Sequence, residues 1–238
     1  MEVHHHPHVE KKGFKEYFLE FLMIFLAVTM GFFAEGLREH IRDNNQGKIY
    51  MRSWGEDLRK DTAQFANLIQ KLKNIDSITD NIFNCYDSVS HHLQSTSCMN
   101  QVVPWLQGFP DFVYTDKTLQ ELKNAGGLRL ISEKSVRDSI IEYDVWVSRE
   151  LIHQQTMEIF QQKAVDATEA IINFSAFSKL SRLSPNNLRI ELLQKDQQAI
   201  DRYFNMLIAF KKSVHSQIHY MVLLQLKATG MIEFLNHF

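Results

Sequence analysis

The chain reads YFLEFLMIFLAVTMGFFA from Tyr17 to Ala34, and apolar side chains cover every face of the helix that this stretch would form. A helix that is apolar all round lies either in a large core or in lipid. At 1.5 Å per residue its length would be about 27 Å, close to the ~30 Å hydrocarbon thickness of a bilayer. Glu20 shortens the charge-free run, but it lies one turn from the end and can reach the interface. We therefore expect one transmembrane helix over residues 17–36.

The apolar run also resembles a secretory signal peptide, but Phe32 and Phe33 stand where cleavage needs small residues. We therefore expect an uncleaved signal anchor. Basic residues flank both ends, with Lys11, Lys12 and Lys15 before the run and Arg38, Arg42, Lys48 and Arg52 after it. The lysines crowd the membrane entry, which favours a cytoplasmic leader and a large domain in the periplasm.

One face of this helix carries Glu20, Ile24, Ala27, Gly31 and Glu35, at spacings of three and four. Ala27 and Gly31 form a small-xxx-small pair, which lets two helix backbones approach closely. The face therefore predicts association with a second membrane helix. The alternative is that small residues recur by chance and that Glu20 only reaches toward the interface.

Residues 1–16 form a polar leader with four histidines, His4, His5, His6 and His8. Neutral imidazoles suit Zn, Cu or Ni, so a metal site is one interpretation. Pro7 and the shortness of the leader leave no second shell to orient the rings, which favours a flexible or partner-bound tail.

The composition bounds the partners and the fold class. The formal net charge is −2, from 26 basic and 28 acidic residues, which argues against nucleic acid as a partner. Only nine glycines and four prolines favour helices over strands and turns. Cys85 and Cys98 can pair in a disulfide if the domain is exported, and are ordinary thiols if it is cytosolic, so two cysteines do not decide the compartment.

A regular stripe then predicts a helix over about residues 50–94, after a break near Asn44–Gly47. Its members alternate three and four apart, like a coiled-coil seam: Trp54, Leu58, Asp61, Phe65, Leu68, Leu72, Ile75, Thr79, Ile82, Tyr86, Val89 and Leu93. A helix of this length needs other helices to cover its stripe.

The rest of the chain reads as an apolar loop and further helices. The loop 95–114 is apolar enough to be packed down. Asp116 should cap a short helix that ends at Gly126 or Gly127, and Ser132 should cap a long helix over about 133–177. Ser184-Pro185 should open the last helix, 186–229, which Gly230 ends.

The two later long helices carry weaker stripes. They are Met157, Phe160, Ala164, Ala167, Ile171 and Phe174 in one, and Ile200, Phe204, Leu207, Val214, Ile218 and Met221 in the other. Together these patterns predict an all-α fold, with one N-terminal transmembrane helix followed by an elongated bundle over residues 37–238.

Two stretches carry a resemblance. The opening EVHHHPHVEKKGFKEYFLEFLMIFLAVTMGFFAEGLREH and the later ELKNAGGLRLISEKSVRDSIIEYD are similar to elements of an uncharacterised family of single-pass membrane proteins from Bacteroidota. The resemblance implies a bacterial inner-membrane protein and a native His-rich leader. It implies no catalytic residues, since no reaction is assigned to that family.

The sequence contains no phosphate-cradling glycine loop, no GxSxG, no HExxH and no dinucleotide fingerprint, so we expect no catalytic site. Two pairs have a spacing that can hold a metal edge, His215 with His219 and Glu150 with His153. Solvated helix faces are the favoured interpretation of both pairs, and we expect no resident cofactor.

These observations leave three functions open. The first is a membrane-anchored scaffold or accessory subunit that acts through association with itself or with a larger complex. The second is a periplasmic sensor that passes its signal to a separate protein. The third is an oligomeric ion-conducting assembly with Glu20 and Glu35 as acidic rings.

Overall fold

The computed structural model describes residues 13–84, 111–175 and 190–237, together with Tyr86, Val89, Met99 and Gly108. In this part of the chain the helices are α1 (Phe14–Phe83), α4 (Lys117–Asn124), α5 (Lys134–Ile171) and α6 (Gln197–Leu235), with a 3₁₀ turn η2 (Gly127–Leu130). The only strand-like pairing among these residues is an isolated bridge between Ile172 and Leu192. The predicted all-α fold is confirmed.

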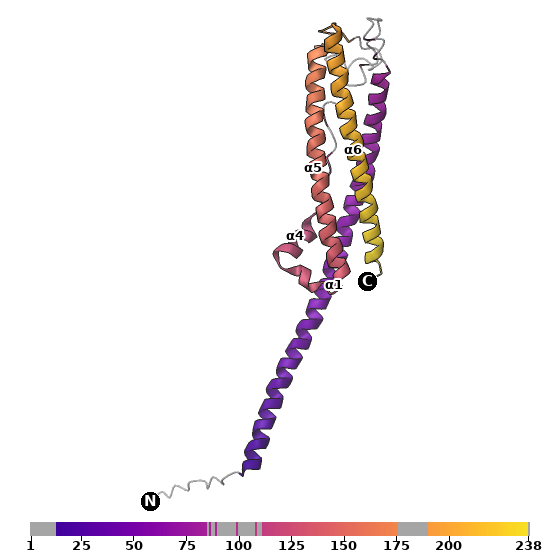
Figure 1. Ribbon diagram of the computed structural model, residues 1–238. Helices are drawn as coiled ribbons and strands as arrows, with labels where there is room; N and C mark the ends of the chain where they lie inside the picture. The colour runs from indigo at the N-terminus through magenta and orange to yellow at the C-terminus, as the bar shows by residue number, and fades with distance from the viewer. Residues whose placement is uncertain are drawn as a thin grey trace, which may run out of the picture.

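The second half of α1 forms a long bundle with α5 and α6, and the first half of α1 leaves the bundle as a single helix (Figure 1). Helices α1 and α5 run in the same direction, and α6 returns antiparallel to both. Helix α6 packs along α1 and α5, whereas the backbones of α1 and α5 stay farther apart.

The predicted stripe on α1 is the core of this bundle. Its described members from Trp54 to Ile82 are all buried, Val89 is buried as well, and Tyr86 is half-buried. Leu93 lies outside the described residues. The stripe on α6 is more regular than the sequence suggested, because Tyr203, Phe210, Leu224 and Ala228 continue it at three-four spacing.

The end of the predicted apolar loop fills the space between α1 and α5. Phe112 is buried, and its ring stacks on Phe65 of α1 with centroids 4.5 Å apart. The Gln64 side chain bonds both the N–H and the carbonyl of Val113, at 3.2 and 2.9 Å. Gln154 of α5 accepts from the Phe112 N–H at 2.9 Å. Met99 and Phe112 of the loop are therefore packed down, as expected, whereas Val113 is 68% exposed.

Two buried carboxylates of α1 hold the chain that follows. Asp61 accepts from the Thr115 N–H at 3.0 Å and from the Tyr143 hydroxyl at 3.0 Å. Asp57 accepts from the Thr118 N–H at 3.1 Å, at the start of α4. A carboxylate there satisfies one of the free N–H groups of the helix. Burial raises the pKa of Asp61, although these donors act in the opposite direction.

This arrangement corrects two predicted caps. Asp116 precedes α4 but its side chain accepts from Gln120 instead, at 3.0 Å, because Asp57 already serves the N-terminus of α4. Helix α5 follows Glu133 rather than Ser132, whose carbonyl accepts from Arg137 at 2.9 Å. Gly126, with a φ of 63°, has the predicted left-handed conformation after α4.

Several predicted helix ends are also wrong. Helix α5 ends at Ile171 rather than near residue 177. The next residue, Ile172, pairs with Leu192 in the isolated bridge. Helix α6 begins at Gln197, and Asp196 caps it by accepting from the Ala199 N–H at 2.9 Å. The predicted opening at Ser184-Pro185 lies outside the described residues. Gly230 does not end α6, which continues to Leu235.

The largest correction concerns the predicted break near Asn44–Gly47, because α1 is one helix of 70 residues. Gly47 is buried in this helix, and a β-carbon there would overlap the backbone carbonyl of Leu130. The glycine is therefore explained by the close approach of the turn η2 to α1. It does not end a helix.

This contact predicts an unusual effect for Gly47→Ala. Alanine favours a helix over glycine by about 1 kcal/mol, yet here its methyl group would push η2 away from α1. We expect the free energy of unfolding of the bundle to fall by about 1 to 3 kcal/mol, as overpacking does elsewhere, measured by chemical denaturation.

The matched control is Gly36→Ala in the same helix. A β-carbon at Gly36 has no neighbour within 4 Å, so this change should leave the bundle's stability unchanged or slightly raised. Equal effects of the two substitutions would contradict the explanation of Gly47.

Candidate functional site

The first candidate site is the apolar N-terminal part of α1. Its most apolar eighteen-residue window has a mean hydropathy of 2.0, and none of it is buried. Phe32 and Phe33 are each 75% exposed. By length and composition this is one candidate membrane-spanning helix. The hydroxyl of Thr29 donates to the Phe25 carbonyl at 2.7 Å, which is what a polar group in lipid would require.

The predicted association face lies on this unpacked part of the helix. Ile24, Ala27, Gly31 and Glu35 are exposed, and Glu20 is half-exposed. A β-carbon added at Gly31 would meet nothing within 4 Å. The face is therefore open for a neighbouring helix in the single chain.

Between this part and the bundle, α1 is a bare, charged stalk. Glu35 pairs with Arg38 at 2.6 Å, and Glu39 pairs with Arg42 at 3.2 Å. These pairs are three residues apart on one helix and support it by a few tenths of a kcal/mol each. From Glu35 to Gly47 the stalk rises about 18 Å.

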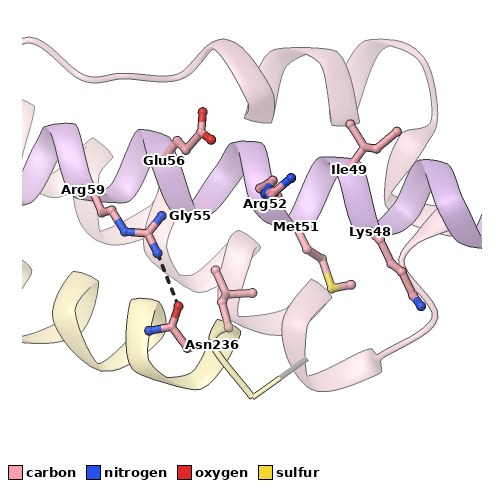
Figure 2. Close-up of a pocket in the computed structure, with 9 residues that line it drawn as sticks. Lys48, Ile49, Met51, Arg52, Gly55, Glu56, Arg59 and Asn236 are labelled. Atoms are coloured by element: carbon pink, nitrogen blue, oxygen red, sulfur yellow. Dashed lines mark hydrogen bonds between the residues drawn. The ribbon is translucent and has the colours of Figure 1, made fainter.

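A hollow of about 620 Å³ lies where the stalk enters the bundle (Figure 2). Lys48, Arg52, Glu56 and Arg59 of α1 line it together with the C-terminal end of α6. Arg59 donates to the side-chain oxygen of Asn236 at 3.3 Å, which joins the two helices across the hollow. All four of these α1 side chains are exposed. The hollow is an open, charged groove, without a buried polar group that would select a ligand.

A buried polar pair lies in the core between α5 and α6. Glu150 is 0% exposed and Gln217 is 1% exposed. The Gln217 amide donates to Oε1 of Glu150. Burial raises the pKa of Glu150 to about 8, so the carboxyl group is mainly protonated at pH 7.

Protonation of Glu150 also provides a hydrogen bond between the two remaining polar atoms of this pair. Oε2 of Glu150 and Oε1 of Gln217 are buried and have no hydrogen-bond partner when both are counted as acceptors. A protonated Oε2 becomes a donor, and a carboxylic acid can pair with a primary amide through two hydrogen bonds. The neutral acid is therefore the form that suits this core.

The predicted metal pairs are not brought together as ligand sets. Glu150 faces Gln217, whereas His153 stacks on Tyr220 with centroids 3.7 Å apart. His215 lies 3.3 Å from Asp76, which also binds Lys211 at 2.7 Å. Within the described residues no group of three or more His, Cys, Asp or Glu side chains is placed to hold a metal ion.

The other predicted ligands cannot be placed. His4, His5, His6 and His8, like Cys85 and Cys98, lie outside the described residues.

Glu150 was predicted as a weak metal ligand rather than as half of a buried polar pair, and Gln217 was not predicted as a site residue. Glu150 continues a three-four stripe on α5 that begins at Val136 and passes through Ile140, Tyr143 and Val147, all of them buried. Extending the stripe from Met157 toward the start of α5 would have predicted a buried carboxyl group. Gln217 likewise continues the buried stripe of α6, between Val214 and Met221.

The pair predicts a pH-dependent effect for Glu150→Gln. The unfolded chain releases the Glu150 proton near pH 4.5, whereas the folded chain keeps it up to about pH 8. The stability that the neutral Glu150 gives to the fold is complete below pH 4.5 and is lost as the pH rises to about 8. Glutamine stays neutral, so the variant should be the more stable by on the order of 4 kcal/mol at pH 8. The difference should shrink toward pH 4.5.

Denaturation of both proteins across this pH range measures the effect. Glu169→Gln, at an exposed position of the same helix, is the control and should leave the native pH dependence in place. A stability difference for Glu150→Gln that is the same at every pH would contradict a buried, protonated Glu150.

Comparison with known proteins adds no relative to this description. No family model matches the chain, and no match is found among curated proteins or solved structures.

Proposed function

We propose that this protein is a membrane-anchored helical scaffold or accessory subunit that acts through association with other protein chains. The observation that carries the proposal is the continuity of α1, which joins a candidate membrane span to the core of the bundle in one helix. A movement or a fixed position of the membrane helix is thereby transmitted directly to the bundle.

The division of α1 supports this function. The first part has the apolar surface that lipid requires, the stalk has charged pairs that suit water, and the last part has the buried stripe that α6 covers. A stalk of about 18 Å would hold the bundle clear of the lipid headgroups. This arrangement would hold the bundle at a fixed distance from the membrane.

The proposal includes the finer assignments that the sequence suggested. The membrane is the bacterial inner membrane, the leader is cytoplasmic and the bundle is periplasmic. The face of Glu20, Ile24, Ala27, Gly31 and Glu35 contacts a second membrane helix, and the small residues at its centre support this assignment.

Membrane insertion is tested with a double substitution, Phe25→Lys with Val28→Lys. Each lysine near the helix centre costs about 2.5 to 3.5 kcal/mol of insertion free energy. We expect the native chain to stay with the membranes after an alkaline wash and the variant to be released. Leu226→Lys, at a position of α6 that is 66% exposed, is the matched control and should stay with the membranes. Release of the native chain would contradict an integral anchor.

The same membranes report the orientation. A cysteine at Asn45, an exposed position of the stalk, should react with an impermeant reagent in spheroplasts, measured against the native chain. Labelling only after the membranes are opened would place the bundle in the cytoplasm instead.

A further inference from the structure

A second apolar stripe runs along the outer face of α5. Its members are β-branched and exposed, in contrast to the buried stripe of the same helix: Ile141 at 49%, Val145 at 46%, Ile152 at 61% and Ile159 at 57%. Four such residues on one helix face form a patch of the kind that marks an interaction surface.

The spacing of this stripe is that of a coiled coil. Val145, Ile152 and Ile159 recur every seven residues, as residues at position a of a heptad do. The matching d positions are the exposed residues Ile141, Ser148, Gln155 and Gln162. Helix α5 therefore has two seams, one inside the bundle and one facing outward.

We propose that the outer stripe of α5 binds the same stripe of a second copy of this chain, in a parallel, in-register dimer. This inference rests on the proposed scaffold function and names the partner chain.

The flanking charges fit a parallel, in-register pair. In this arrangement a residue at position g of one helix lies near position e of the next heptad in the other. Asp144 would meet Arg149, and Glu158 would meet Lys163, so both contacts join opposite charges. Asp144 also accepts from Lys123 of its own chain at 2.7 Å. An antiparallel pair centred between Ser148 and Ile152 would instead bring Asp144 close to Glu158.

The residue types at position a agree with this arrangement. Valine and isoleucine at a, combined with leucine at d, favour two-stranded parallel coiled coils, and the a positions of this seam fit that rule. The polar d positions make the seam weaker than a full coiled coil. Two chains inserted in one membrane have a high effective concentration, however, which compensates for a weak interface.

The direction of α1 supplies the third argument. Two copies anchored in the same bilayer are related by an axis along the membrane normal, which requires parallel bundles. Figure 1 shows that the unpacked part of α1 slants below the bundle toward the side on which α5 lies. A twofold axis beside α5 would therefore bring the two apolar segments toward each other.

Disulfide crosslinking in native membranes tests the proposal, in a full-length chain whose Cys85 and Cys98 are replaced by serine. Gln162→Cys places a cysteine at a d position near one end of the seam, where only a parallel, in-register pair brings the two copies together. We expect a covalent dimer on mild oxidation. Lys212→Cys, at an exposed position of α6, is the control and should stay monomeric.

A second variant tests the stripe in a chain that keeps its native cysteines. Ile152→Lys with Ile159→Lys places like charges at two central layers, and both positions are exposed, so the bundle should stay folded by circular dichroism. The detergent-extracted mass should fall from two chains to one. The same double substitution, made in the cysteine-replaced chain that carries Gln162→Cys, should abolish the crosslink.

Three results would overturn the dimer. They are a native mass of one chain, no more crosslinking at Gln162→Cys than at Lys212→Cys, and an unchanged mass in the double lysine variant. Co-purification of a different protein with a single copy of this chain would assign the stripe to that partner. None of these results concerns the alkaline wash, so a failed dimer and a failed membrane anchor are distinguishable.

Discussion

The rest of the structure depends on the backbone of α1 staying helical from Phe14 to Phe83. In lipid every backbone N–H and carbonyl must be bonded within its own segment, and only a helix does this with a single chain. In the bundle the same periodicity places one stripe of side chains against α6. One secondary structure thus suits both the candidate membrane span and the bundle, and only the side chains differ between these two parts.

Polar groups inside the bundle complement this apolar framework. The backbones of α1 and α5 stay apart, so the chain that ends the apolar loop lies between them, although Tyr143 of α5 contacts Trp54 and Asp61 of α1. Asp57, Asp61 and Gln64 follow one another along α1 and bind the backbone of this chain at Thr118, Thr115 and Val113. A shift of one heptad would leave the two buried carboxylates, Asp57 and Asp61, without partners, at a cost of about 1 to 3 kcal/mol each. The polar contacts therefore fix the register that apolar packing alone leaves free.

The sequence predicted the parts of this fold that depend on periodicity. The stripe of α1 was correct from Trp54 to Ile82 and at Val89, because burial on one helix face needs only a regular spacing of apolar residues, whereas Tyr86 is half-buried. The ends of helices were predicted poorly, because they depend on contacts between distant residues. Gly47 alone suggests a helix break, but the structure places it against the Leu130 carbonyl inside a continuous helix. Asp116 alone suggests a helix cap, but Asp57 accepts the hydrogen bond at the start of α4. The Glu150–Gln217 pair was missed for the same reason, since its two members come from different helices.

The most direct test of this account is the distance between spin labels at His40 and Gln70, two exposed positions on either side of Gly47. The labels would be attached through cysteines in the full-length chain, with Cys85 and Cys98 replaced by serine, and measured by pulsed electron paramagnetic resonance in membranes. A continuous helix places the two backbone positions about 45 Å apart, at 1.5 Å for each of the intervening residues. We expect a narrow distribution near that value. A broad distribution, or one centred well below about 35 Å, would show that α1 breaks between the membrane and the bundle, as the glycine at the junction first suggested.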